Sequence, residues 1–548
     1  MILDRELEVS ADGQQVDRSV IYRLSESISR HGILLFGCFL IAVVVLQVLS
    51  GAYKAEFSGY PDEPAHYVTS LMLRNYIAEF KFSSPLHFAQ DYYYHYPKVA
   101  LGHWPPVFYI VQAFWMLLFS ASRTSIRLEV AVTTALLAWS VFRECRQWLG
   151  TNAGILAGAL LISLPLIQTY TNEEMAEGLL VLFCFWACIH FTRYLESGRW
   201  INNFYFGVLF SLAVLTKGNG WLLALIPPTA IVLTRRYSLL TRRSFWVAPL
   251  TVSILCLPWQ IVTMKLAAQG WEGGSEPSLH YTLAALGQFA LVLPQILGFS
   301  LLALLALGVF QLVLRPLVAR RAVASGPAVM FSLLVAAWLF HSIVPAGVED
   351  RKLIIAVPGM ILFVFAGGMF LADHLPLTDT WYDWRYRVVA VAGAIVFFMG
   401  TFSIPKVRHY GYAEAASFIT SDPVLRKSTV LVSSESGGEG MLVSEIAMHQ
   451  PRPEDVVVRA TKALAQVNWN ASRYRSTFKS ADEILDYVKR QKIGLVVVDS
   501  FAAQNTFEHN RLVRQAIRQF PCFRLISCFP ASGKDRGRVE LYRVENTD

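Results

Sequence analysis

Charged side chains are scarce in this chain. They make up 16% of its 548 residues, whereas 54% of the residues are hydrophobic. A soluble domain contains about 25% charged residues. Because the mean hydropathy is +0.42 and the apolar residues fall in long runs, the composition excludes an ordinary soluble protein and indicates a membrane protein.

Signals for secretion, disulfide bonding and nucleic-acid binding are also lacking. The first 30 residues are polar, and the first apolar run, Gly32–Ser50, has no clean small-residue cleavage site, so we expect a retained signal anchor. Five of the seven cysteines lie in or beside apolar runs, and Cys522 and Cys528 are too few for a disulfide framework. The net charge is +8, but the Arg residues are spread over loops, so nucleic acid is not an expected partner.

Apolar segments recur over the first 404 residues, and we expect 11 to 13 membrane spans. Eleven candidates cover residues 32–51, 124–142, 152–169, 174–192, 203–216, 218–234, 244–264, 288–314, 327–345, 353–371 and 387–403. Residues 105–120 are also apolar, and counting them as a span would invert every later segment.

The distribution of Arg decides between the two layouts, because loops on the cytoplasmic side carry an excess of Lys and Arg. If residues 105–120 lie against the outer leaflet, the five cytoplasmic loops 143–150, 193–201, 235–243, 315–326 and 372–386 hold twelve Arg. The short loops opposite them hold only Lys217, Lys265, Arg351 and Lys352. We therefore expect a cytoplasmic N-terminus over residues 1–31, a transmembrane domain over 32–404 and a first outer loop over 52–123.

Residues 405–548 have a different pattern and are expected to form an extracytoplasmic α/β domain. Short β-branched runs near residues 429–432, 455–458, 494–499, 523–529 and 538–543 alternate with helical patterns near 411–420, 440–449, 481–491 and 508–519. This alternation predicts a small parallel or mixed sheet. No internal repeat and no low-complexity segment is evident in the sequence.

Adjacent carboxylates, Asp62 and Glu63, stand between two prolines just after the first span. Carboxylates at a membrane boundary are costly unless they are solvated, paired or used. One of them could be a general base that deprotonates an acceptor, or the pair could hold a divalent metal against a phosphate. A structural alternative is that Asp62 caps the following helix, whose first turn Pro64 suits.

Other candidate side chains share the outer face with this acidic pair. Arg351 and Lys352 are cations on a side otherwise poor in them, which suits a phosphate, although Glu349 and Asp350 could pair with them locally. Lys217 stands in a tight turn and is a second candidate for an anion. Candidate substrate-binding residues are His66, Tyr67, His103, Glu173, Glu174, Glu349 and Asp350, with helix-end electrostatics as an equal explanation for Glu173 and Glu174.

The order of these motifs resembles a known family. The acidic pair follows the first span, a Trp104-Pro105-Pro106 helix and Arg127-Leu128 come next, and Leu215-Thr216-Lys217-Gly218 and the loop of residues 349–352 precede Val357-Pro358-Gly359. This order is similar to that of the GT-C membrane glycosyltransferases, in particular the protein O-mannosyltransferase and lipid A aminoarabinose transferase group, over residues 50–370. At residues 64–67 the sequence departs from the pattern, which leaves the acceptor open.

The resemblance implies an inverting glycosyltransferase that uses a polyprenyl-phosphate sugar at the outer face of the bacterial inner membrane. Asp62, with Glu63 as its neighbour, would be catalytic, and Arg351, Lys352 and Lys217 would hold the donor phosphate. Two other classes remain as alternatives: a transporter or flippase of a lipid or polysaccharide, and a non-catalytic scaffold whose α/β tail binds a partner. A transporter is disfavoured because its ionisable residues usually lie at the midplane and its halves repeat.

Overall fold

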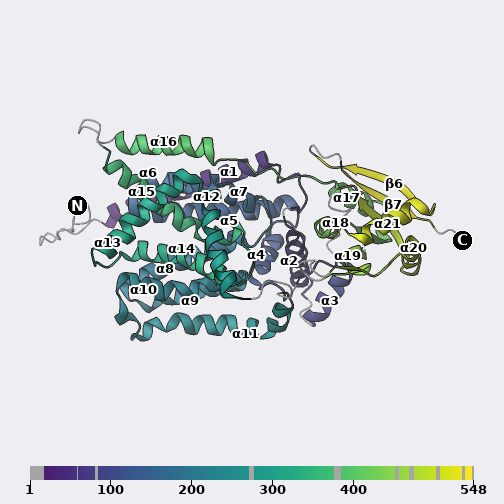
Figure 1. The fold of residues 1–548 in the computed structure, drawn as a ribbon, viewed down its shortest axis with the longest axis horizontal. Helices are drawn as coiled ribbons and strands as arrows, with labels where there is room; N and C mark the ends of the chain where they lie inside the picture. The colour runs from purple at the N-terminus through teal and green to yellow at the C-terminus, as the bar shows by residue number, and fades with distance from the viewer. Residues whose placement is uncertain are drawn as a thin grey trace, which may run out of the picture.

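A helical body and a smaller sheet-containing domain lie end to end along the long axis of the molecule (Figure 1). The computed structural model describes residues 18–58, 60–80, 84–100, 102–270, 277–375, 384–450, 456–467, 474–501, 507–532 and 537–545. Helices far outnumber strands, and the described strands all belong to the C-terminal part of the chain. The fold is therefore a polytopic helical protein that carries a C-terminal α/β domain, as expected from the sequence.

Seven helices in the described residues are long and apolar enough to cross a membrane, or eight if one bent pair counts as a span. The helical body consists of α1 (Arg18–Ser50), α5 (Arg123–Leu149), α6 (Thr151–Ser163), α7 (Pro165–Asn172), α8 (Glu177–Ser197), α9 (Trp200–Thr216), η1 (Gly218–Leu225), α10 (Ile226–Thr234), α11 (Val247–Gly270), α12 (Leu279–Val309), η4 (Phe310–Leu314), α13 (Arg315–Val318), α14 (Ser325–Ile343), η5 (Asp350–Ala356), α15 (Val357–Asp373) and α16 (Trp384–Gly400).

Each of the eleven predicted spans corresponds to one of these helices or to a broken pair of them. The pair α6 and α7 is bent by 60° at Pro165, which cannot continue the hydrogen-bond ladder of the preceding helix. Helix α9 and the pair η1 and α10 are shorter apolar helices. The 17 residues of α9 rise about 26 Å, slightly less than the hydrocarbon core of a typical bilayer.

Three short helices, α2 (Glu63–Ala78), α3 (Pro85–His95) and α4 (Val107–Leu118), lie where the helical body meets the sheet domain (Figure 1). Helix α4 has 12 residues and rises only about 18 Å, so it is too short to cross a bilayer. This length agrees with the prediction that residues 105–120 do not form a span. The helix positions the first outer loop against the ends of the spanning helices.

The C-terminal domain is built on a five-stranded mixed sheet of order β2-β1-β5-β7-β6. Its strands are β1 (Thr429–Ser433), β2 (Val457–Arg459), β5 (Ile493–Asp499), β6 (Phe523–Pro530) and β7 (Arg538–Val544), with a two-stranded pair of β3 (Ala465–Gln466) and β4 (Arg475–Ser476). Strand β1 pairs in parallel with β2 and β5, whereas β7 pairs antiparallel with β5 and β6. The helices are α17 (Tyr412–Ser421), α18 (Ser436–His449), α19 (Ala460–Ala463), α20 (Ala481–Arg490) and α21 (Glu508–Gln519), and the expected mixed sheet is confirmed.

The sheet domain and the first outer loop share one hydrophobic core. Phe57, Tyr67 and Leu71 of the loop belong to the same buried cluster as Tyr412 and Val430 of the sheet domain. Buried apolar surface stabilises an interface by roughly 25 cal/mol per Å², so a shared core fixes the two segments together. The sheet domain is thus held over the outer loop rather than tethered beside it.

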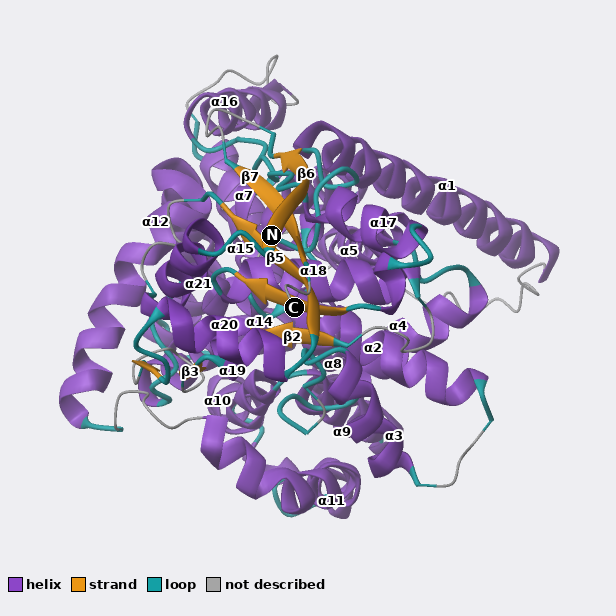
Figure 2. Ribbon diagram, turned by 90° about the vertical axis from the view of Figure 1, so that its right-hand side faces the viewer, coloured by secondary structure: helices purple, strands orange, loops and turns teal. Residues whose placement is uncertain are grey.

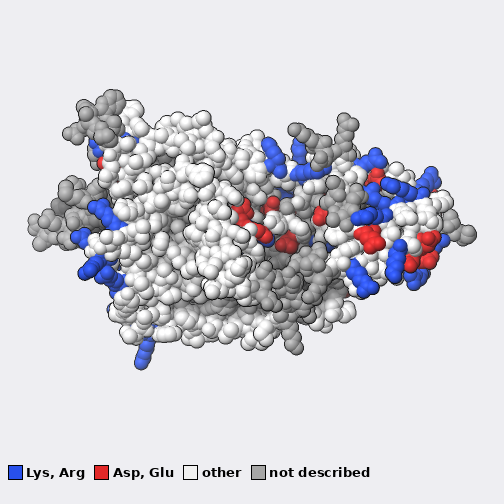
Figure 3. Space-filling view, viewed as in Figure 1, with Lys and Arg blue, Asp and Glu red and all other residues white. Residues whose placement is uncertain are grey.

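Helices at the rim of the helical body face outward with apolar side chains, as a bilayer requires. Viewed from the sheet-domain end, α1, α11, α12 and α16 lie at the periphery (Figure 2). Only 17% of the most apolar window of α1 is buried, whereas 78% of that of η5 and α15 is buried. Figure 3 shows Lys and Arg at the end of the body far from the sheet domain, and an uncharged surface between the two. The Arg-rich loops and the sheet domain therefore lie at opposite ends.

Candidate functional site

The first outer loop and the late loop (residues 348–353) meet at the boundary between the helical body and the sheet domain. The Arg351 guanidinium lies 4.4 Å from the centre of the Tyr60 ring, in a cation–π contact. Tyr60 stands two residues before Asp62, and Arg351 lies in the first turn of η5. The structure thus brings together the two segments that hold the predicted base and the predicted phosphate-binding residues.

Asp62 immediately precedes α2, and its side chain makes no capping hydrogen bond. The half-buried carboxylate lies within electrostatic reach of His66, Lys98 and His103. Burial lowers the pKa of His66 to about 4 and the pKa of Lys98 to about 7. The nearest basic groups are therefore desolvated, and the capping explanation for Asp62 has no support from the side-chain geometry.

Glu63 is locked in a buried ion pair. Arg127 Nη1 donates to Glu63 Oε1 at 2.6 Å, and both side chains are fully buried. The backbone N–H of Glu174 donates to the same oxygen at 2.7 Å. A buried, paired carboxylate is costly to disturb, so this geometry favours an anchoring role for Glu63.

The three predicted cations differ in how they are paired. Lys217 Nζ pairs with Glu177 Oε1, and Arg351 Nε pairs with Glu349 Oε2. Lys352 is 7% exposed, and no described side chain forms a hydrogen bond or an ion pair with its ammonium group. The charges of Lys217 and Arg351 repel it, and those of Glu349 and Glu177 attract it, so Lys352 belongs to a single cluster of charged side chains.

Acidic residues beside the cations are buried with incomplete hydrogen bonding. One oxygen of Glu173 and both carboxylate oxygens of Glu174 have no hydrogen-bond partner among the described residues. Burial raises the pKa of the Glu174 carboxyl, and the charge of Glu63 raises it further. Asp350 Oδ1 accepts a hydrogen bond from the Arg351 backbone at 2.7 Å, which is a local helix-start contact.

The predicted aromatic and histidine residues divide into two groups. Tyr67 is buried against Phe57, with ring centres 4.6 Å apart, and donates to the Ala121 carbonyl, so it belongs to the core. His66 hydrogen-bonds Tyr109 at 3.2 Å and packs on Trp104 with ring centres 4.8 Å apart. His103 packs edge-on against the same Trp104. His66 and His103 therefore line the surroundings of Asp62, whereas Tyr67 does not.

Lys98, a candidate phosphate contact in the sequence, adjoins the site, whereas Glu177 and Arg127 were not among the predicted functional residues. Lys98 Nζ donates to the Pro61 carbonyl at 2.9 Å, immediately before Asp62. Glu177, the partner of Lys217, stands at the start of an apolar helix, and an acid at that position opposite a lone lysine is the signal that could have paired them. Arg127 stands at the start of the second apolar run. Its partner, Glu63, lies 64 residues earlier, so no local sequence pattern indicates the ion pair.

The residues around Asp62 do not fit a metal site. The Glu63 carboxylate is already held by Arg127, so the adjacent pair offers only one uncommitted carboxylate. In the described residues, metal-ligand spacing occurs at Glu56, His409 and Glu414, which do not include the acidic pair. The Glu56 carboxylate there accepts hydrogen bonds from the N–H groups of Tyr410, Gly411 and Ala413.

The fold and the cluster of charges at the outer loops define a class: the chain has the fold of the GT-C membrane glycosyltransferases. A sequence model of the family described as dolichyl-phosphate-mannose-protein mannosyltransferase matches residues 103–261. No curated protein has a detectable sequence match to the chain.

Two groups of solved structures share this architecture. ArnT from Cupriavidus metallidurans bound to undecaprenyl phosphate is 14% identical, with a TM-score of 0.54 over 92% of this chain and 97% of ArnT. The Archaeoglobus fulgidus oligosaccharyltransferase in its apo form is 11% identical, with a TM-score of 0.53 over 85% of this chain and 69% of that one. The same enzyme tethered with an acceptor peptide has a TM-score of 0.52 and 13% identity, over 91% of this chain and 74% of that one.

Proposed function

We propose that this protein is an inverting glycosyltransferase that moves a sugar from a polyprenyl-phosphate donor to an acceptor at the outer face of the bacterial inner membrane. The observation that carries the proposal is the contact of Arg351 with the Tyr60 ring at 4.4 Å, which brings the late loop to within two residues of Asp62 in the first outer loop. A carboxylate and a group of cations therefore surround one small region at the outer ends of the helices. The undecaprenyl phosphate bound to ArnT supports a lipid phosphate as the leaving group.

The cations stabilise the phosphate as it departs. Lys352 is the strongest candidate because no described side chain forms a direct ion pair with its ammonium group. Arg351 and Lys217 are partly neutralised by Glu349 and Glu177, and they add positive potential around it. Charge that develops on the leaving oxygen in a desolvated site is stabilised most by such fixed cations.

Asp62 is the base that removes a proton from the acceptor as its oxygen or nitrogen attacks the anomeric carbon. Attack opposite the departing phosphate inverts the configuration at that carbon, and the proton passes to the Asp62 carboxylate. Glu63 holds the start of α2 in place through Arg127 and so orients Asp62.

The orientation in the membrane follows from the separation of charge. The Arg-rich loops lie at the end of the body opposite the sheet domain, and loops rich in Lys and Arg favour the cytoplasm. The acidic pair, the late loop and the sheet domain then face the extracytoplasmic side, where nucleotide sugars are absent and a membrane-borne donor is required.

Donor consumption by the purified protein tests this function. In lipid nanodiscs with radiolabelled undecaprenyl-phosphate sugars, the native protein should release undecaprenyl phosphate, and Asp62→Asn should lower that rate by about 10²- to 10⁴-fold. The matched control is Asp91→Asn, which removes an exposed carboxylate of α3 and should retain the native rate. Near-native turnover by Asp62→Asn would show that this carboxylate is not the base, and no donor consumption by the native protein across the sugar panel would reject the reaction.

A further inference from the structure

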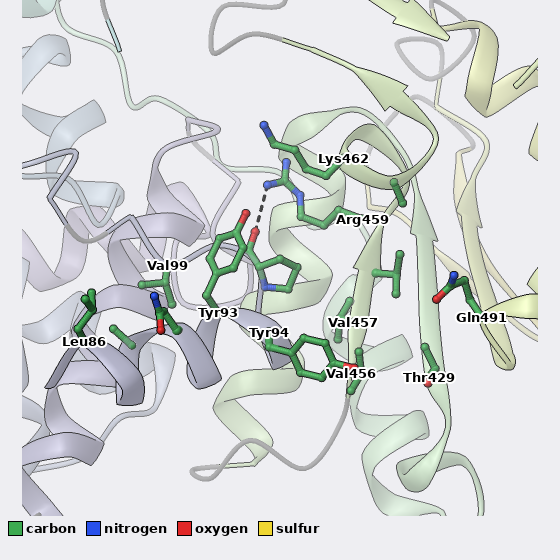
Figure 4. Close-up of a pocket in the computed structure, with 15 residues that line it drawn as sticks. Leu86, Tyr93, Tyr94, Val99, Thr429, Val456, Val457, Arg459, Lys462 and Gln491 are labelled. Carbon is green, nitrogen blue, oxygen red and sulfur yellow. Dashed lines mark hydrogen bonds between the residues drawn. The ribbon is translucent and has the colours of Figure 1, made fainter. Parts of the chain in front are cut away.

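A second cavity, separate from the cations around Asp62, lies between α3 and the edge of the sheet (Figure 4). Its volume is about 670 Å³, which is within the usual range for a site that holds a small molecule. Helix α3 supplies one wall, and edge strand β2 with α19 supplies the other. The cavity therefore exists only because the sheet domain is docked on the first outer loop.

Two tyrosines give this cavity aromatic surface. Tyr93 is 45% exposed and Tyr94 is 66% exposed, although both are large and partly apolar. In Figure 4 the Tyr93 ring points towards Arg459, and the Tyr94 ring points towards Val456. Exposed aromatic faces with a hydroxyl at one end suit ligands that combine apolar C–H faces with polar groups, as sugar rings do.

Two positively charged side chains line the cavity, and they differ in how they are paired. The Arg459 guanidinium is held by Glu439 at 3.0 Å and donates to the Pro97 carbonyl at 3.2 Å. Lys462 makes no hydrogen bond or ion pair with a described residue. Lys462 is an exposed lysine at the rim of the cavity, so its ammonium group is available to an anionic group of a bound ligand.

Hydrogen bonds connect the wall of this cavity to the backbone next to Asp62, the proposed base. Pro97 lines the cavity and accepts the hydrogen bond from Arg459, which Figure 4 marks with a dashed line. The next residue, Lys98, donates to the Pro61 carbonyl at 2.9 Å, and Pro61 directly precedes Asp62. Two successive hydrogen bonds therefore link the cavity wall to the backbone that precedes Asp62, so the cavity and the proposed base share one stretch of the outer loop.

We propose that this cavity is a subsite for the acceptor and that it takes a sugar bearing an acidic group. Tyr93 and Tyr94 contact the faces of the sugar, and Lys462 binds its carboxylate or phosphate. The inference rests on the proposed function, since only a transferase needs an acceptor subsite at this place. It gives the sheet domain a role in acceptor choice, distinct from the donor phosphate at the late loop.

Saturation-transfer NMR on the full-length protein in nanodiscs tests the subsite with two probes, trigalacturonate and the neutral maltotriose. Trigalacturonate should bind more tightly, and Lys462→Gln should weaken its binding about tenfold, as expected for a hydrogen bond to a charged group. Tyr94→Ala should weaken both probes, whereas Tyr94→Phe should retain binding because it keeps the ring. Lys489→Gln, an exposed lysine of α20 outside the cavity, is the matched control and should leave both affinities unchanged.

Equal binding of the two probes, no binding of either, or native affinity in Lys462→Gln would each overturn the subsite. Donor consumption, measured on the same samples without an added acceptor sugar, reports the proposed function independently. If the protein consumes donor but does not bind trigalacturonate, the acceptor subsite is rejected and the proposed function stands. If the protein binds trigalacturonate through Lys462 but consumes no donor, the proposed function is rejected, while the binding site for an acidic sugar stands.

Discussion

The Arg351 guanidinium lies 4.4 Å from the centre of the Tyr60 ring, although 291 residues separate the two along the chain. Arg351 also pairs with Glu349, so the ring and the carboxylate together fix the orientation of the guanidinium. Tyr60 precedes the acidic pair, and Lys352 follows Arg351. This one contact therefore sets the position of the proposed base relative to the proposed phosphate-binding cations.

Replacing the Tyr60 ring should impair use of the donor. A cation–π contact contributes about 0.5–2 kcal/mol, which corresponds to roughly 2- to 30-fold in rate or affinity. We expect Tyr60→Leu to raise the KM for the polyprenyl-phosphate sugar within that range, while Tyr60→Phe stays near the native value because it keeps the aromatic face. Steady-state kinetics with radiolabelled donor measure both, and an equal defect in the Phe variant would assign the effect to the hydroxyl.

The buried pair of Glu63 and Arg127 should matter for stability more than its neighbour Asp62 does. Removing one partner of such a pair leaves an uncompensated buried charge, which costs about 3–5 kcal/mol. We expect Glu63→Gln to lower the melting temperature clearly, and Glu63→Gln combined with Arg127→Met to recover part of the loss. Asp62→Asn is the matched control, since its carboxylate makes no capping bond, and a similar loss of stability in it would contradict the distinction drawn between the two carboxylates.

Elements governed by local patterns could be predicted from the sequence. The apolar runs correspond to the helices of the body, and the β-branched runs near residues 429–432 and 494–499 correspond to β1 and β5. The Arg distribution was sufficient to assign residues 105–120 to a short helix that does not span, because loop charge depends only on the order of segments. The contact between the first outer loop and the late loop, seen at Tyr60 and Arg351, agrees with this shared sidedness.

Pairings between distant side chains could not be predicted, because they depend on how the helices pack. Nothing near Glu63 in the sequence distinguishes a carboxylate bound by Arg127 from one that is free. The same holds for Lys98, which reaches the backbone before Asp62 only because the sheet domain covers it. Asp62 and Glu63 are adjacent in the sequence, but Glu63 is bound in a buried ion pair with Arg127. Arg127 lies 64 residues further along the chain, so the sequence around the two carboxylates does not indicate this difference.

A larger residue at Gly440 should disturb the site from the sheet-domain side. Helix α18 approaches so closely there that an added Cβ would lie 2.8 Å from Lys98 Cε and 2.9 Å from the Pro64 ring. The lysine is buried and the proline is rigid, so neither gives way easily. We expect Gly440→Leu to lower kcat for transfer at least tenfold while donor binding changes less, because the late loop is untouched.

Gly437 provides the matched control for this change on the same helix. A Cβ added there meets Glu435 Oε1 at 2.5 Å, the end of a flexible side chain that is only half-buried and can turn away. Gly437→Ala should therefore retain the native kcat, and its melting temperature should fall only slightly, since Glu435 caps the start of α18 through the Gly438 N–H at 3.3 Å. Single-turnover and equilibrium donor-binding measurements separate the two steps, and an equal loss of donor binding and kcat in Gly440→Leu would argue against a specific displacement of Lys98.

The attachment of the sheet domain should depend on pH through His409. Its Nδ1 lies 3.2 Å from Glu56 Oε2 of the outer loop, and its Nε2 lies 3.1 Å from Glu414 Oε2 of α17. The hydrogen bond to Glu56 and the two carboxylate charges raise the pKa of His409, against burial and the charge of Arg123. A raised pKa in the folded protein means that the imidazolium stabilises the fold fully below the unfolded value of about 6.5, and that this stability is lost as the pH rises through the folded value.

We therefore expect the melting temperature of the native protein to fall as the pH rises above about 6.5, with protease cleavage near residues 401–411 increasing over the same change. His409→Gln removes the titrating group while keeping a hydrogen-bonding side chain, so its melting temperature should be lower at pH 6 and should change less with pH. His87→Gln, an exposed histidine of α3, should keep the native pH slope. An unchanged slope in His409→Gln would mean that other groups control the pH dependence, and that the contact of His409 with Glu56 does not hold the sheet domain in place.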